Sequence, residues 1–262
     1  MALQWYYRLG GTGSGLTQAQ QDNNIKCVYG CLNSYGWSKE AIAGACGCML
    51  AESGYNPGIY ESSSGGTINN LPYFPGGMGL CQWTDYPAYS GTYPNPLPFH
   101  AQQEGKNWWD GSFQCWLMTK ANDSSYTPMG YGQGPRWGWS ERSAYPVNMS
   151  FNTYIHTSSY SIEDMVRCWY YCFESHYAAG DPGSIRLNAG VHAYNLIKNL
   201  TPEIPEGYID GGGGTDPEPP TPTTPKRGNA WWCPKSSWCD TCGFEKLCGK
   251  ELQCTEFLKT EV

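Results

Sequence analysis

Charged side chains are scarce in this chain of 262 residues, and their balance is acidic. Lys and Arg number 16 against 23 Asp and Glu residues, which gives a formal net charge of -7 at pH 7. A nucleic-acid-binding protein gathers Lys and Arg on one surface, so this balance argues against a nucleic-acid partner. No apolar run is long enough to span a bilayer. The first residues, Met1 to Gln4, lack the basic and then apolar pattern of a signal peptide.

Aromatic residues and cysteines, by contrast, are abundant, with 12 Trp, 20 Tyr and 13 Cys. Many of these rings are expected to be partly exposed, and exposed rings beside polar side chains suit the alternating apolar and hydroxylated faces of sugars. The alternative is a large aromatic core, which accounts for some of them. So many cysteines are unusual in a reducing cytosol, which predicts oxidised pairs in a protein that works outside the cell. Because the count is odd, at least one thiol is free, intermolecular or metal-bound.

The segment 38–54 has the local signals of a buried helix. Ser38 can accept a hydrogen bond from one of the first free backbone N–H groups, and Gly54 supplies a left-handed stop. Apolar and small residues surround most of the girth of this helix, so we expect it to be buried. Gly44 and Gly47 inside it each disfavour a helix by about 1 kcal/mol relative to alanine, which predicts that another element packs closely there.

Glu52 is the unusual residue of this helix, because it places a carboxylate in the last turn of a buried element. The C-terminal end of a helix carries partial negative charge, and apolar neighbours desolvate an ionised group. Both effects predict a raised pKa for Glu52. A carboxylic acid that keeps its proton near neutral pH can act as a general acid. The alternative interpretation is a solvated glutamate at a fraying helix end.

Two motifs in this region resemble the phage tail lysozyme family, which comprises the cell-wall muramidases of tail-tip proteins and some endolysins. The first reads A-G-x-x-G-x-M-x-x-E-S-x-x-N-P from Ala43 to Pro57, and the second reads G-x-G-L-x-Q-W-T from Gly77 to Thr84. Weaker matches extend the resemblance over roughly residues 20 to 200. It implies a mainly α (α+β), lysozyme-like fold with long cleft-forming loops, and it makes Glu52 the general acid.

The resemblance also implies a substrate. That substrate is the glycan strand of peptidoglycan, cleaved at the β-1,4 bond between N-acetylmuramic acid and N-acetylglucosamine, with no cofactor and no metal. The predicted substrate-binding residues lie in or beside the two motifs and are Tyr55, Asn56, Gln82, Trp83 and Thr84. By resemblance Gln82 helps to line the sugar-binding cleft, whereas its sequence context alone describes an ordinary strand residue.

The second catalytic group is harder to place. A glycoside hydrolase usually adds another carboxylate, and the separation of the two sets the stereochemical course. Glu61 and Asp85 are the candidates by position, although neither falls in the family's motif proper. If neither serves, the muramic acid's own groups assist, as in lytic transglycosylases, which resemble this fold and leave a 1,6-anhydro product. A function of another class is a non-catalytic wall-binding or structural tail protein.

The composition divides the chain into four segments. They are an N-terminal arm at 1–15, a lysozyme-like domain at 16–205, a Gly/Pro/Thr-rich linker at 206–228 and a small Cys/Trp-rich module at 229–262. The arm is either mobile or a docking peptide. Within the domain, further helices are predicted after Thr17, over 107–121, after Ser161 and over 188–200. Arg186 and Glu174 are expected to pair and to hold two helices together, a structural role.

The cysteines leave alternatives open. The first two predicted helices carry two cysteines each, so a disulfide across their hairpin is one option and buried free thiols are the other. The module at 229–262 is too small to bury much of a core, so it needs covalent or metal staples. Two disulfides and one leftover thiol suit an extracellular destination better than zinc bound through Cys239 and Cys242.

The module at 229–262 is the predicted attachment site, which would bind phage tail proteins or anionic wall polymers through exposed Trp and Lys side chains. The alternative is a stapled stub that only caps the chain. Because a peptidoglycan substrate lies outside the membrane and no signal peptide is evident, we expect delivery by another route. The protein is either part of the virion tail or released from the host cytoplasm at lysis, and it acts at the bacterial cell wall.

Overall fold

The computed structural model describes residues 2–11, 15–61, 68–84, 94–127, 129–130, 134–135, 137–141, 147–174 and 180–210. The chain divides into two compact units, Met1–Pro222 and Thr223–Val262, and every described residue belongs to the first. The predicted module at 229–262 and the linker from 211 onward therefore lie outside the described residues. The described part is mainly α-helical, which confirms the predicted fold class.

The first two helices form the predicted hairpin. Helix α1, Gln18–Ser34, begins at a capping box in which Thr17 and Gln20 each bond the other's backbone. Helix α2, Lys39–Ser53, begins where the Ser38 hydroxyl accepts from the Ala41 N–H, and it ends at Gly54, whose φ of 57° is left-handed. These caps explain why the first and last residues of both helices could be predicted closely from local sequence alone.

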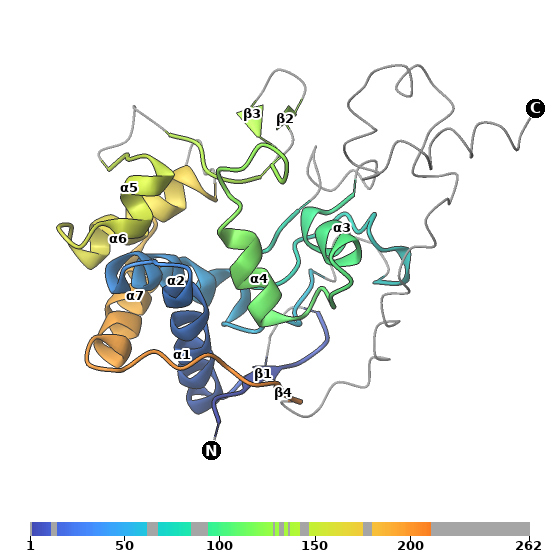
Figure 1. Ribbon diagram of the computed structural model, residues 1–262, viewed down its shortest axis with the longest axis horizontal. Coiled ribbons are helices and arrows are strands. Elements are labelled where there is room, and N and C mark those ends of the chain that lie inside the picture. Colours follow the sequence, from blue (N-terminus) through green and yellow to red (C-terminus); the bar gives the residue numbers. More distant parts are fainter. Residues whose placement is uncertain are drawn as a thin grey trace, which may run out of the picture. The chain divides into compact units, whose positions relative to one another are not determined.

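Helix α2 is the central helix of the domain and packs against four others (Figure 1). Besides α1, these are α5, Phe151–His156, α6, Ile162–Cys172, and α7, Ser184–Ile197. A Cβ atom on Gly44 would lie 2.8 Å from the backbone of Met165 in α6, and one on Gly47 would lie 2.8 Å from the Arg186 carbonyl oxygen in α7. Because Cβ contacts are not this short, the two glycines permit the close packing that was predicted.

A second group of elements is built on shorter helices. They are the 3-10 helix η2, Ile68–Asn70, then α3, Pro96–Gln103, and α4, Gly111–Met118; β2, Met129–Gly130, pairs antiparallel with β3, Gly134–Pro135. Helix α4 is shorter than the predicted 107–121, because the Asp110 carboxylate accepts from the Phe113 N–H and caps the helix there. Gln114 of α4 is fully buried, and its amide joins Leu80 to Pro57 and Trp108 through hydrogen bonds of 2.7–2.8 Å.

The N-terminal segment is part of the domain. Strand β1, Trp5–Tyr7, pairs in parallel with β4, Tyr208–Asp210. Trp5 is fully buried, its ring lies against Gly111, and its indole N–H donates to Ser112 at 2.9 Å. The prediction of a mobile arm or docking peptide is therefore wrong for these residues, and residues 208–210 of the predicted linker belong to a strand pair.

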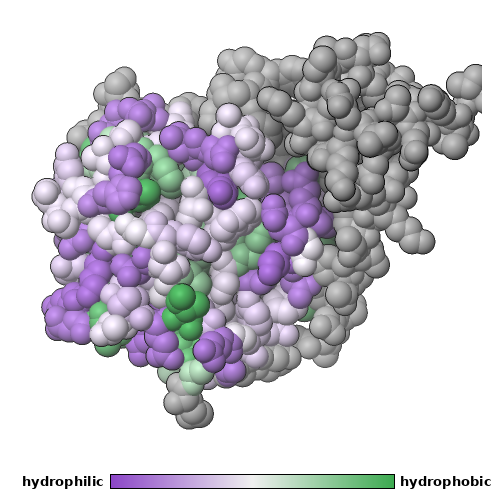
Figure 2. Space-filling view, in the orientation of Figure 1, coloured by the Kyte–Doolittle hydropathy of each residue, from purple (hydrophilic) through white to green (hydrophobic). Residues whose placement is uncertain are grey.

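The described surface is largely polar, and Figure 2 shows hydrophobic residues only as small separate areas on the face in view. Eight of the nine described tryptophans are buried, so these rings form core rather than exposed sugar-binding platforms. Within the described part of the chain, no helix combines the length and apolar character needed to cross a membrane.

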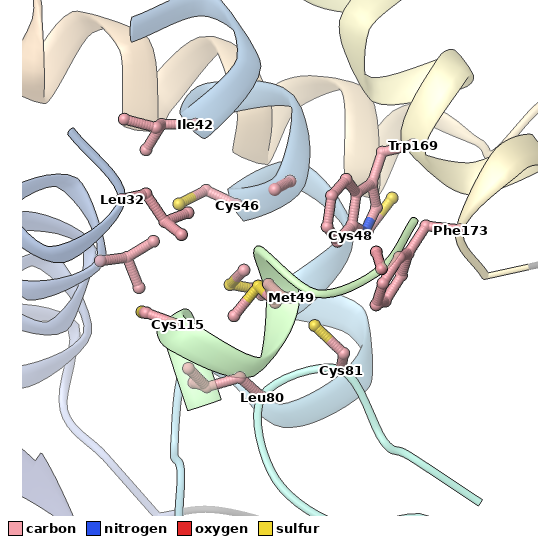
Figure 3. Packing of buried hydrophobic residues seen from close by; sticks show 14 of the residues in the cluster. Leu32, Ile42, Cys46, Cys48, Met49, Leu80, Cys81, Cys115, Trp169 and Phe173 are labelled. Carbon is pink, nitrogen blue, oxygen red and sulfur yellow. The ribbon is translucent and has the colours of Figure 1, made fainter. Parts of the chain in front are cut away.

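All eight cysteines of the described residues are buried and free. The Sγ atoms of Cys168 and Cys172 are 3.9 Å apart, roughly twice the length of an S–S bond. The four cysteines of the hairpin are among these free thiols. The predicted disulfide across the hairpin is therefore wrong, and the alternative of buried free thiols is confirmed. Figure 3 shows the reason, since Cys46 and Cys115 lie among apolar side chains such as Leu32 and Met49 and act as small apolar groups themselves.

This burial makes the thiols of residues 27–172 inert until the domain unfolds. We expect a brief treatment of the native protein with iodoacetamide, without reductant, to leave all eight unmodified. Denaturation should then expose all eight to alkylation, still without reductant. Peptide mass mapping measures both outcomes, and a disulfide-linked peptide pair from this region would contradict the structure.

Candidate active site

Glu52 lies in the last turn of α2, one residue before the end of the helix at Ser53, as predicted. Its side chain is 21% exposed, so solvent reaches a carboxylate that is otherwise surrounded by the domain. The Arg186 guanidinium donates from Nη2 to Glu52 Oε1 at 2.6 Å. Glu52 and Arg186 therefore form an ion pair between the end of α2 and the first turn of α7.

Arg186 also faces a second carboxylate. Its Nε atom lies 3.9 Å from Glu174 Oε2, and the Glu174 side chain is only 5% exposed. The predicted Arg186–Glu174 pair is thus present, but Arg186 is shared with Glu52. Burial disfavours the charged guanidinium, yet the charges of Glu174 and Glu52 outweigh this effect and raise the pKa of Arg186. The guanidinium carbon also lies 5.2 Å from the centre of the Tyr170 ring, a cation–π contact.

Two buried thiols border the carboxylates. Cys48, on α2, and Cys81, in the second motif, both belong to the buried hydrophobic cluster drawn in Figure 3. Burial raises the pKa of both thiols well above its usual range, and the charges of Glu174 and Glu52 raise it further. Both groups are therefore protonated and neutral at pH 7 and cannot serve as nucleophiles.

The second motif forms a tight loop that is tied to the end of α2. The Ser53 hydroxyl lies 3.0 Å from the carbonyl oxygens of both Met49 and Leu80, and so joins the helix to the loop. Met78 and Trp83 pair through two backbone hydrogen bonds of 3.0 Å. Gln82, within this turn, has a left-handed φ of 49°, a conformation that is rare for residues other than glycine. Non-glycine residues held in this way are found preferentially at functional sites.

Three of the predicted substrate-binding side chains are not at the surface. Tyr55 and Asn56 are 1% exposed and Trp83 is 3% exposed, so none of them can contact a glycan strand in this structure. Asn56 instead holds the N-terminal segment, because its amide accepts from the Arg8 N–H and donates to the Arg8 carbonyl. In this structure these motif residues shape the loops, and their assignment to substrate binding stays a prediction.

The remaining predicted residues are less buried. Gln82 and Thr84 are half-buried; the Gln82 amide donates to the Gly79 carbonyl, and the Thr84 hydroxyl to the Gln82 carbonyl. Glu61 is half-buried as well, and one of its carboxylate oxygens accepts from the Gly77 N–H at 3.3 Å. Asp85 lies outside the described residues.

The described domain matches a known protein family. The family model described as phage tail lysozyme matches residues 23–197, about two thirds of the sequence, and that range contains Glu52, Glu174 and Arg186. The chain belongs to the phage tail lysozyme family. It therefore has a lysozyme-like, peptidoglycan-degrading domain, and its place of action is the phage tail or the bacterial cell wall.

Arg186 of this phage tail lysozyme domain was predicted to have only a structural role, and its contact with Glu52 was not predicted. A signal for its position was present, since a carboxylate at the end of an apolar helix requires a cation or a proton. Arg186 is also the third residue of α7, a position where the helix dipole disfavours a positive charge. Among the described residues, no group of three or more His, Cys, Asp or Glu side chains is arranged to hold a metal ion.

Proposed function

We propose that this protein hydrolyses the β-1,4 bond between N-acetylmuramic acid and N-acetylglucosamine in peptidoglycan, with Glu52 as the general acid. The observation that carries the proposal is the setting of Glu52: a partly exposed carboxyl group at the end of the central buried helix. A rigid helix fixes the position of the group, and its exposed fraction leaves room for contact with a substrate oxygen.

In the proposed reaction, the Glu52 carboxyl group donates its proton to the glycosidic oxygen while the bond from that oxygen to the anomeric carbon breaks. The bonding electrons leave with the oxygen, and positive charge develops on the sugar ring. Water then supplies a hydroxyl group to the anomeric carbon, and its second proton returns to the enzyme. Glu61 and Asp85 remain the proposed candidates for the group that assists this water or stabilises the positive charge.

The closing experiment for this function is product analysis. Purified peptidoglycan is digested with the full chain, and the fragments are identified by mass spectrometry before and after borohydride reduction. We expect fragments with a reducing N-acetylmuramic acid end, which gain two hydrogens on reduction. Fragments with a 1,6-anhydro end do not gain them, and they would replace hydrolysis by lytic transglycosylation. A lack of both products, with binding to walls retained, would identify a non-catalytic wall-binding protein.

We further propose that the chain beyond the linker attaches the domain to tail proteins or wall polymers. Because β4 extends to Asp210, a truncation should leave residues 1–210 intact. We expect the 1–210 fragment to cleave short soluble glycan chains at a rate within about threefold of the full chain, while the fraction bound to whole walls falls. Pelleting of walls with bound protein measures the second quantity, and equal binding by both proteins would rule out an anchor.

A further inference from the structure

We infer that the N-terminal segment, residues 3–10, positions the candidate active site, and that Asn24 and Asn56 are the positioning residues through which it acts. The inference rests on the proposed function, because it concerns the placement of Glu52 and of the chain that follows it. It gives the N-terminal segment a part in the reaction, whereas the sequence predicted an arm outside the domain.

Asn24, on α1, connects the N-terminal segment to the turn that follows Glu52. Its carboxamide oxygen accepts from the Tyr6 N–H at 2.8 Å, and its nitrogen donates to the carbonyl oxygens of Tyr6 and Tyr55 at 2.6 and 2.9 Å. Tyr55 lies three residues after Glu52 and has a left-handed φ of 60°, which is rare for a residue other than glycine. Such a conformation persists only where its surroundings hold it, and Asn24 is part of those surroundings.

Asn56 makes a second connection of the same kind. Its carboxamide accepts from the Arg8 N–H at 3.0 Å and donates to the Arg8 carbonyl at 2.8 Å, and the same oxygen accepts from the Gly58 N–H at 3.0 Å. A Cβ added to Gly58 would lie 2.6 Å from the Arg8 carbonyl oxygen, so the two backbones are in close contact. Alternate residues of the N-terminal segment, Tyr6 and Arg8, are thus held against residues 55–58 by the amides of two buried asparagines.

The next residues, 58–61, connect the N-terminal segment to the second motif. On one side, the Gly10 carbonyl accepts from the Tyr60 N–H at 3.0 Å. On the other side, the Ile59 carbonyl accepts from the Gly79 N–H at 2.8 Å. The loop of the second motif is in turn joined to the last turn of α2 through the Ser53 hydroxyl. The N-terminal segment therefore supports both motifs, and both are adjacent to the end of the helix that carries the proposed acid.

A single substitution in the N-terminal segment can weaken this support without changing either motif. Tyr6→Pro removes the N–H from which Asn24 accepts. The Trp5 N–H, which donates to the Gly207 carbonyl on the other side of the strand, is kept. The sequence of residues 52–61 is unchanged, so any effect on the site is transmitted through the contact with Asn24.

Two measurements on the full-length Tyr6→Pro protein test the inference, both made well below its melting temperature, where the protein is folded. Amide hydrogen exchange in peptides that cover residues 53–61 should become about 10-fold faster, because the hydrogen bonds there open more often. For soluble glycan chains, kcat should fall about 10-fold or more with KM nearly unchanged, because a small displacement of the acid slows the reaction without weakening binding.

Tyr29→Phe is the matched control. It removes one hydrogen bond made by the same helix α1, from the Tyr29 hydroxyl to the Leu200 carbonyl at 3.0 Å, in the chain that follows α7. Loss of one such bond should lower the melting temperature by about 2–4 °C. We expect kcat and the exchange of residues 53–61 to keep their native values in this variant, because a purely structural contact changes only the melting temperature.

The exchange measurement needs no activity, so the outcomes separate this inference from the proposed function. If the native protein produces no cleavage, or if Glu52→Gln is as active as native, the proposed function is wrong. If native cleavage depends on Glu52 but Tyr6→Pro keeps the native kcat or the native exchange of residues 53–61, the positioning inference alone is wrong. Should Tyr6→Pro not fold, Arg8→Pro and Asn56→Ala test the second connection with the same two measurements.

Discussion

Replacing Glu52 by glutamine is expected to lower the rate of glycan cleavage by ~10²–10⁴-fold, because the substitution removes the donated proton. The carboxamide oxygen keeps the shape of the carboxyl group and can still accept the hydrogen bond from Arg186 Nη2, which is 2.6 Å long in the native protein. Arg186 also retains Glu174 as a charged partner. The melting temperature should therefore change little, which separates a loss of chemistry from a loss of fold.

Cleavage of soluble glycan chains measures the rate, and calorimetry measures the fold. Glu104→Gln is the matched control, since Glu104 is exposed at the end of α3 and lies away from both motifs in the sequence. It should cleave at the native rate. A Glu52→Gln protein that cleaves within a few-fold of native would remove Glu52 from the role of general acid.

The largest expected effect on stability comes from Gly47→Leu. An added Cβ would lie 2.6 Å from Val166 Cγ2 and 2.8 Å from the Arg186 carbonyl oxygen, and the rest of a leucine side chain needs still more room. Overpacking of this kind costs ~1–3 kcal/mol or more, which exceeds the ~1 kcal/mol gained by removing a glycine from a helix. We expect aggregation, or a melting temperature at least about 5 °C lower.

Gly180→Leu is the control for this variant, because no atom of the described residues lies within 4 Å of a Cβ added there. It should unfold at nearly the native temperature. Gly47→Ala tests the same contact with one carbon atom and should lower the melting temperature by a smaller amount. Native-like melting of Gly47→Leu would mean that α2 and α7 are not packed as the structure has them.

The parts of the fold that follow from local signals could be predicted from the sequence. Helix α2 begins after Ser38 and ends before Gly54, because both caps act within a few residues. The glycines inside the helix indicate that another helix packs closely against it. The partner of Glu52 could not be predicted in the same way, because Arg186 is 134 residues away and depends on the contact of α7 with Gly47.

Long-range pairing explains the other differences. The predicted arm contains a strand because its partner, β4, follows about 200 residues later, and no local pattern records that pairing. The cysteine count led to predicted disulfides, but burial among apolar side chains, not compartment, decides the state of these thiols. The motif residues Asn56 and Trp83 show a further limit, since a motif alone does not tell which of its side chains are buried.

The strand pair at the edge of the domain has a mechanical consequence. Because β1 and β4 run parallel, a tension applied between the chain before Trp5 and the chain after Asp210 pulls the two strands along their length in opposite senses. The hydrogen bonds between them, such as Trp5 N–H to the Gly207 carbonyl at 3.0 Å, are then stretched together instead of opening one at a time. A force applied across the outer ends of this strand pair is therefore resisted by several hydrogen bonds at once.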